Sequence, residues 1–251
     1  MKKRIIDSFL ILILIASTLA LAFSTSGVSA KSNTPNVVIV HLDGPLTPVW
    51  KIILKRGIDL GTKNHSAAVI VELNTTGGSI DLMTNLIQQI IDSPTPVVMY
   101  VSPKGSMAAS AGTLLTLAGK VSAMAPETIL GAASPVGSQG EDLTSTETLK
   151  TKEALKATAR SLIASRGTKA VALAEQAIDD AKAASADEAL SAGLIDIIAN
   201  DEQDLLQQLD GRTVLVTGST ETLHTLNAEI IETPITQVEN ILGLLTNPNI
   251  I

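Results

Sequence analysis

Four short aliphatic runs alternate with helix-like segments, and this order constrains the fold more than any other feature of the sequence. The runs are NVVIVHLDG (36–44), AAVIVEL (67–73), TPVVMYV (95–101) and VSAMAP (121–126). Continuous aliphatic runs of this length are typical of strands that are buried on both faces of a parallel sheet. Because strands and helices alternate, right-handed crossovers are expected to join parallel strands, which predicts an α/β fold.

The segments between the strands have the apolar spacing of helices. Residues 49–65 and 80–92 are predicted to be amphipathic helices, and MAASAGTLLTLAG (107–119) is predicted to be a helix of small residues. Aromatic residues make up only 2% of the chain, so Ile, Leu, Val and Ala must form the core. Residues 131–146 are rich in Gly and Ser and are predicted to be a long loop, which at this length is often functional. Further helices and a short strand are predicted over 146–211.

The two ends of the chain differ from the middle. Residues 1–30 combine a basic start (MKKR), an apolar run (FLILILIASTLALAF) and small residues before Ala30, which predicts a signal peptide or a retained N-terminal anchor. In either case the rest of the chain is expected to be exported. The main domain is predicted over 36–211. Residues 212–251 are predicted to form a small β appendage followed by an amphipathic tail, a possible approach to a membrane region.

Composition excludes several classes of function. A net charge of −7 without a basic run argues against a nucleic-acid partner. The absence of cysteine excludes disulfides, thiolate metal sites and a cysteine nucleophile. No nucleotide phosphate-loop motif is present, and neither a metal nor a cofactor is indicated. The chain has three scattered histidines without metal-ligand spacing, which are His41, His65 and His224.

Two glycine-rich segments follow neighbouring predicted strands. TTGGS (75–79) comes after the second strand and GSMAASAG (105–112) after the third. Ligands collect at the carboxyl ends of parallel strands, so both segments are expected to lie side by side. Gly77 and Gly78 can leave backbone N–H groups uncovered next to a helix N-terminus, which favours an anion. A lone Gly-Gly pair is more often an ordinary strand-to-helix turn.

Ser106 and Ser110 are the candidate nucleophiles, although a serine among small residues can also serve helix packing alone. A serine needs a base to remove its proton, and no histidine occupies a suitable position. A lysine can act as the base, because burial disfavours the ammonium form. Lys150 and Lys152 open the helix after the long loop, although charges in such a segment usually form a solvated face.

Three segments in this order resemble the N-terminal domain of NfeD-like membrane proteases, which are ClpP-class serine proteases. They are LNTTGGSIDLMTNLIQQI, PVVMYVSPKGSMAASAGTLLTLAG and MAPETILGAASPVG. The resemblance extends from about Val37 to Asn200. It implies a ClpP/crotonase-like fold of repeated β-β-α and βαβ units with parallel strands.

The resemblance also implies roles for individual residues. Ser110 of the AASAG segment corresponds to the family nucleophile, and the N–H groups of Gly78 and Ala111 correspond to the oxyanion hole. The family base is a lysine near the start of the following helix, which matches Lys150 best and Lys152 next. The family turn commonly reads T-P-G-G, and here a threonine replaces the proline.

The implied function is an exported, membrane-associated serine endopeptidase with a Ser-Lys dyad and no cofactor. It is expected to act on the extracytoplasmic side, to cleave apolar segments of stomatin-like membrane proteins and to form a homodimer. One alternative is a weakly active or inactive membrane scaffold that binds a stomatin-like partner. Another is an acyl-CoA enzyme of the crotonase type. Such enzymes are usually cytosolic, and an exported chain would not encounter CoA.

Overall fold

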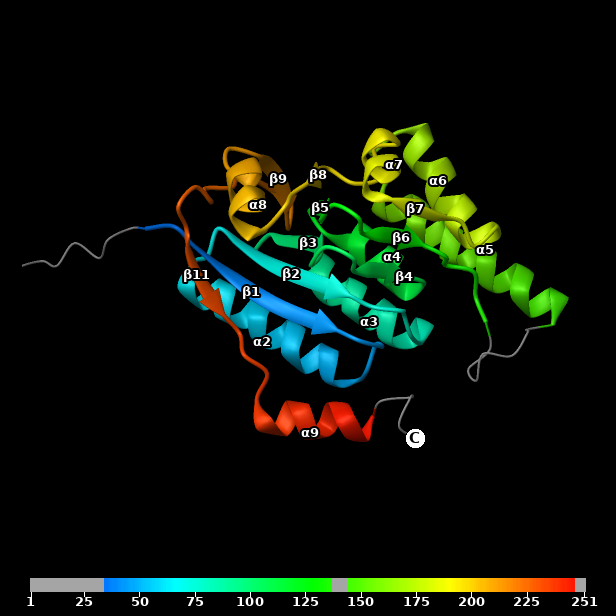
Figure 1. Cartoon of the computed structure of the whole chain (residues 1–251), viewed down its shortest axis with the longest axis horizontal. Coiled ribbons are helices and arrows are strands. Elements are labelled where there is room, and N and C mark those ends of the chain that lie inside the picture. The colour runs from blue at the N-terminus through cyan, green and yellow to red at the C-terminus, as the bar shows by residue number, and fades with distance from the viewer. Residues whose placement is uncertain (1–33, 137–143, 247–251) are drawn as a thin grey trace, which may run out of the picture. The chain divides into compact units, whose positions relative to one another are not determined.

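A six-stranded parallel sheet forms the centre of the molecule, as the alternating pattern predicts (Figure 1). The computed structural model describes residues 34–136 and 144–246, so the predicted signal or anchor at 1–30 lies outside the described residues. The strand order is β11-β1-β2-β3-β5-β8, and every neighbouring pair is parallel. The strands are β1 (Asn36–Asp43), β2 (Ala68–Asn74), β3 (Val97–Val101), β5 (Val121–Met124), β8 (Ile197–Ile198) and β11 (Glu229–Glu232).

Helices cover both faces of this sheet. Residues of α2, α3 and α4 pack on one face together with residues of α5, α6 and α7, while α8 packs on the other. The described helices are α2 (Val49–Asn64), α3 (Ile80–Ile91), α4 (Ala111–Ala118), α5 (Ser145–Leu162), α6 (Thr168–Asp179), α7 (Ala186–Ser191), α8 (Glu202–Leu209) and α9 (Gln237–Leu245).

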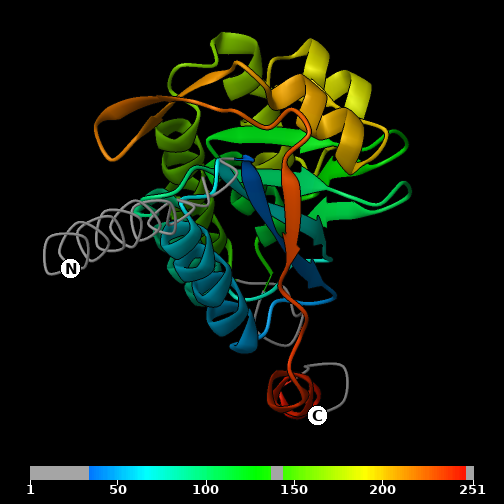
Figure 2. The same ribbon diagram turned by 90° about the vertical axis from the view of Figure 1, so that its left-hand side faces the viewer.

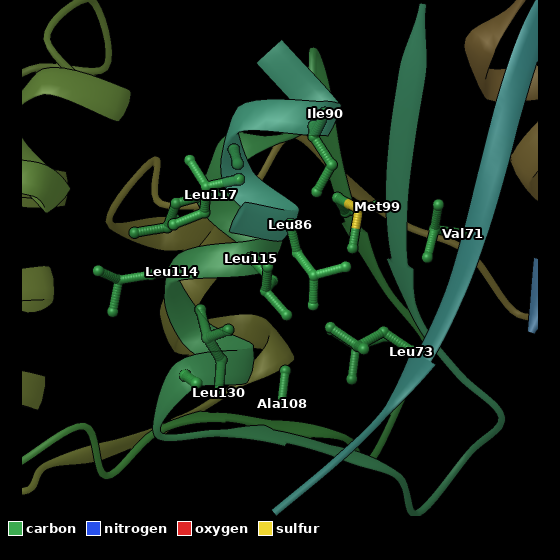
Figure 3. Packing of buried hydrophobic residues seen from close by; sticks show 14 of the residues in the cluster. Val71, Leu73, Leu86, Ile90, Met99, Ala108, Leu114, Leu115, Leu117 and Leu130 are labelled. Atoms are coloured by element: carbon green, nitrogen blue, oxygen red, sulfur yellow. The ribbon is translucent and has the colours of Figure 1, made fainter. Parts of the chain in front are cut away.

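The core divides along the sheet with the period of two that strands impose. In β1, Val38 and Val40 belong to the cluster beneath α2 and α3, while Val37 and Ile39 belong to the cluster beneath α8. The central strands are therefore buried on both faces, which explains why their sequences are continuous aliphatic runs. Figure 3 shows the first cluster, where Leu86 of α3 lies among side chains of β2, β3 and α4.

A second, smaller sheet corrects one prediction. The segment 107–119 was expected to be one helix, but its first residues form β4 (Met107–Ala109), and α4 begins only at Ala111. β4 pairs in parallel with β6 (Ile129–Gly131), which pairs antiparallel with β7 (Ala183–Ser185). These residues form a strand because they pair with backbone groups that are distant in the sequence. The local composition of the segment does not indicate those partners.

The β appendage predicted after residue 211 forms three strands, but only two of them pair with each other. β9 (Thr213–Val216) and β10 (Ser219–Thr222) make an antiparallel hairpin, and Val216 is fully buried in the cluster beneath α8. β11 does not join this hairpin but pairs with β1 at the edge of the main sheet. Within the described residues, no helix combines the length and the hydropathy needed to cross a bilayer.

The last helix, α9, is attached to α2 through an ion pair. Arg56 donates to Glu239 through Nε (3.1 Å to Oε1) and Nη2 (2.9 Å to Oε2), and Nη2 also donates to the carbonyl of Pro234. Glu239 is 5% exposed and completes a capping box with Thr236. Burial raises the pKa of Glu239, but hydrogen bonds from Thr236 and Arg56 outweigh it and leave the pKa below its ordinary value.

Replacing Leu86 with Ala is expected to lower the free energy of unfolding by about 3 kcal/mol, because the side chain is fully buried and leaves a cavity. The measurement is urea unfolding followed by the fluorescence of Trp50, the single tryptophan, which is itself buried. The matched control is Leu226→Ala at a half-exposed leucine, which should change stability by less than about 0.5 kcal/mol. Equal losses for both variants would contradict the described core.

Acidification is expected to detach α9. Since the pKa of Glu239 is lowered in the folded chain, the contact is fully present above the ordinary carboxyl pKa and is lost as the pH falls below it. Hydrogen–deuterium exchange of residues 237–245 should therefore rise on acidification. Glu239→Gln should show the raised exchange already at neutral pH. A variant that exchanges like the wild type would refute this anchor.

Candidate active site

The two glycine-rich segments meet, as their position after neighbouring strands predicts. Thr75, which follows β2, donates from its N–H to the carbonyl of Met107 (2.7 Å), and its own carbonyl accepts from the N–H of Ala109 (3.0 Å). Thr75 and Ala108 thus form a parallel bridge between the end of β2 and β4. This bridge brings the glycine pair after β2 next to the serine that follows β4.

Ser110 lies at a sharp turn between β4 and α4. Its φ of 54° and ψ of −121° are rare for a residue with a side chain and cost about 1–3 kcal/mol. The Ser110 N–H donates to the carbonyl of Gly131 (2.9 Å), and its carbonyl accepts from the N–H of Thr113 (3.0 Å). The buried Thr113 hydroxyl lies 3.0 Å from the carbonyl oxygens of both Ala108 and Gly131. Tertiary contacts therefore hold the strained turn.

The backbone of Gly77 leaves no space for a side chain beside Ser110. Its φ is +106°, and a Cβ there would lie 2.6 Å from the Ser110 Cβ and 3.1 Å from its Oγ. The Gly77 N–H donates to the Thr75 hydroxyl (3.0 Å), and its carbonyl accepts from the N–H of Leu46 (2.9 Å). Gly77 is therefore both a turn residue and a close neighbour of the hydroxyl.

Two further N–H groups lie at this turn. Ala111 is the first residue of α4, where backbone donors have no partner inside the helix, and Gly78 precedes the N-cap of α3. In the described part of the chain, neither N–H has a hydrogen-bond acceptor. The N-termini of both helices add positive potential, so this corner can stabilise a developing negative charge.

Ser110 opens into a cleft of about 650 Å³ between α3, α4 and α5. Most of its lining is aliphatic, and Gly78 and Ala111 lie on its wall with the serine. The residues that line it are Leu46, Pro48, Thr76, Gly78, Ser79, Ile80, Asp81, Leu82, Met83, Ser110, Ala111, Leu114, Ala133, Pro135, Val136, Leu155 and Thr246. Such a cleft can hold an extended apolar peptide.

The candidate lysines do not line this cleft. Lys150 is exposed on α5, and among the described residues it has no hydrogen-bond or ion-pair partner. Lys152 is half-buried, and its Nζ donates to the carbonyl of Asp179 (2.5 Å). Lys156 pairs with Glu153 and Asp179, and its hydrogen bonds with these carboxylates raise its pKa, which disfavours a role as a base.

Sequence reasoning left two serines open, and the structure separates them. Ser106 is buried, donates from its N–H to the carbonyl of Pro103 (3.0 Å) and does not line the cleft. The supporting roles of Thr75, Thr113 and Gly131 were not predicted, because their partners lie in other elements. Within the described ranges, no group of three or more His, Asp or Glu side chains could hold a metal ion.

Comparisons with known proteins extend this description. The model of the N-terminal domain of NfeD1b matches residues 36–216. The membrane-bound protease PH1510 of Pyrococcus horikoshii is 31% identical over 240 residues. The match covers 94% of this chain and 54% of PH1510, so the chain spans about half the length of that relative.

Solved structures agree with the fold. A lysine-to-alanine variant of the membrane-bound stomatin-specific protease 1510-N, in complex with a substrate peptide, superimposes with a TM-score of 0.76 at 29% identity, covering 85% of this chain and 98% of that one. A serine-to-alanine variant gives 0.74 at 30% identity, covering 81% and 99%. ClpP1 from Listeria monocytogenes gives 0.52 at 17% identity, covering 65% and 92%, and shares the fold.

Gly77→Ala is expected to destabilise the chain by at least about 1 kcal/mol more than Gly105→Ala. Both glycines have positive φ, but a Cβ at Gly105 would meet nothing within 4 Å, so this control isolates the clash with Ser110. Urea unfolding of the two variants provides the measurement. Equal stabilities would mean that Ser110 does not approach Gly77 as described.

Proposed function

Because residues 36–216 belong to the family of NfeD1b N-terminal domains, we propose that the chain is a serine endopeptidase. Ser110 is the nucleophile, Lys150 is the general base, and the N–H groups of Gly78 and Ala111 form the oxyanion hole. The observation that carries this proposal is the strained turn that presents Ser110 at the start of α4, next to two backbone donors without acceptors.

The proposed reaction follows from these positions. The neutral amine of Lys150 removes the Ser110 proton while Oγ attacks the carbonyl carbon of the scissile bond. The oxyanion accepts hydrogen bonds from Gly78 and Ala111, each worth about 3 kcal/mol in comparable hydrolases. The lysine ammonium then donates its proton to the leaving amine as the C–N bond breaks. Water hydrolyses the acyl-enzyme with the same lysine as base, and the proton returns to Ser110.

Helix α5 carries two lysines that are candidates for the base, Lys150 and Lys152. Leu155 of α5 lines the cleft, so this helix passes close to Ser110. Lys152 precedes Leu155 by three residues, about 4.5 Å along the axis, and lies on nearly the same face of the helix. Lys150 precedes it by five residues, about 7.5 Å, and is turned about 140° around the helix from it. In 1510-N the spacing between the substituted serine and lysine is midway between the spacings from Ser110 to Lys150 and to Lys152, so it does not select one of them.

We propose an extended apolar peptide as the substrate, because aliphatic side chains dominate the lining of the cleft. The 1510-N relative is named a stomatin-specific protease, which supports the apolar segment of a stomatin-like membrane protein as the natural target. The relative PH1510 is named membrane-bound. We propose that this chain acts at a membrane as well, on the extracytoplasmic side and as a homodimer.

One observation favours the scaffold alternative. Lys150 does not line the cleft in the described structure, and a serine without a base would bind a stomatin-like partner without cleaving it. Activity measurements on the full chain separate these two functions, since the scaffold requires the cleft but not the dyad.

Ser110→Ala is expected to abolish cleavage of an apolar peptide, with a loss of about 10³-fold or more, and to abolish labelling by a fluorophosphonate. Lys150→Ala should lower kcat by about 100-fold or more, because a general base contributes that much. Lys152→Ala tests the second lysine in the same assay. Lys156→Ala is the matched control and should retain nearly full activity, since its amine pairs with carboxylates.

Circular dichroism and a thermal melt must show that each variant is folded. Turnover that persists in Ser110→Ala would reject the nucleophile. A large loss in Lys152→Ala with none in Lys150→Ala would move the base to Lys152. Peptide binding by the wild type without any cleavage would favour the scaffold.

A further inference from the structure

Helix α9 is oriented with its charged side chain inward and its apolar side chains outward. Its single charged residue, Glu239, is buried in the ion pair with Arg56. We define its outer face as Val238, Ile241, Leu244 and Leu245, which are 66%, 57%, 54% and 64% exposed. An amphipathic helix on a globular domain normally buries its apolar stripe. The reversed orientation means that the domain holds α9 by polar contacts and leaves the apolar surface available.

The C-terminal end of α9 reaches the cleft. Thr246, the residue directly after α9, lines the cleft together with Ser110. Leu46 and Pro48, which come just before α2, the helix to which α9 is anchored, also line the cleft. Figures 1 and 2 show α9 below α2 and beside no other described helix. The chain therefore passes directly from Leu245 of the outer face to Thr246 on the wall of the cleft.

We propose that the outer face of α9 is a docking surface for the apolar part of the peptide substrate that extends beyond the cleft. The proposal rests on the proposed function and deepens it by adding a second binding region to the same site. Residues 237–245 contain no Lys or Arg, so an apolar segment can lie on the outer face without removing a positive charge from water.

The same observations argue against two other occupants. Helices that lie on lipid surfaces usually carry Lys or Arg on their polar side, and α9 has neither. A stable interface between two copies needs about 800 Å² from each partner, which exceeds what one face of a nine-residue helix provides. A peptide segment needs much less area, so it suits this surface better.

The length of α9 sets the length of the substrate. Nine residues at 1.5 Å each make a helix about 13 Å long, and an extended peptide covers this distance with about four residues. A peptide that fills only the cleft should not reach the outer face, whereas one with about four further apolar residues should. The advantage of the longer peptide is therefore the quantity to measure.

The test uses peptide binding by the full chain carrying Ser110→Ala, so that the readout does not require cleavage. Fluorescence anisotropy gives the Kd of a short apolar peptide and of peptides extended by about four apolar residues at either end. We expect one extended peptide to bind about tenfold more tightly, because a partly buried aliphatic side chain contributes about 1.4 kcal/mol. Ile241→Glu and Leu245→Glu should remove this advantage, and Ile241→Leu should keep it.

Leu215→Glu is the matched control, because Leu215 is 63% exposed on β9 and takes the same charge without touching α9. It should retain the tenfold advantage. Equal affinities of short and extended peptides, or an advantage that survives Ile241→Glu, would overturn the docking surface. The proposal would also be overturned if Ile241→Glu left peptide binding unchanged but abolished liposome flotation or changed the sedimentation of the chain. Docking without cleavage by the wild type would refute the protease and retain the docking surface.

Discussion

The backbone of Thr75 pairs with Met107 and Ala109, and the geometry of the candidate site depends on this pairing. The main sheet ends at this point on β2, and the small sheet begins with β4. The two hydrogen bonds of Thr75 join the sheets, so that the glycine turn after β2 and the serine turn after β4 share one corner. Residues more than thirty positions apart become neighbours through this bridge.

The strain at Ser110 has a structural cause and a chemical consequence. A residue with φ of 54° and ψ of −121° requires support, which the carbonyl of Gly131 and the hydroxyl of Thr113 supply. In return, the turn exposes the side chain at the start of α4 and leaves the N–H of Ala111 free of helix partners. Gly77 allows the neighbouring loop to approach within van der Waals contact. The strained turn lowers the stability of the fold, and it places the hydroxyl next to the backbone N–H donors.

The family match confirms the resemblance that the sequence suggested, and the shared fold with ClpP1 agrees with it. Fold and site remain separate questions, because one fold supports many functions. Ser110 and the backbone donors lie on short turns that follow strands of the two sheets. The lysines lie on α5, which contacts the cleft through Leu155. Ser110 is thus held by the sheets, whereas the position of the candidate lysines depends on one helix.

The sequence by itself determined the parallel α/β architecture. Strands buried on both faces are continuous aliphatic runs, and the apolar residues of the helices between them recur with a period near 3.6. It also predicted that the two glycine-rich segments meet, since both follow neighbouring parallel strands. It placed the start of the helix at Met107 wrongly, because β4 exists only through its partners in β6 and at Thr75. Local sequence patterns do not indicate hydrogen bonds between residues that are distant in the sequence.

Only the tertiary structure gave the physical difference between Ser110 and Ser106, and only it revealed the reversed orientation of α9. Both serines lie in the same small-residue segment, and their difference arises from burial and from the turn that Gly131 stabilises. The sequence of α9 shows an amphipathic helix but not which side faces the domain. The position of Arg56 on α2 decides this, because its partly buried ion pair turns Glu239 inward and leaves the apolar side chains in water.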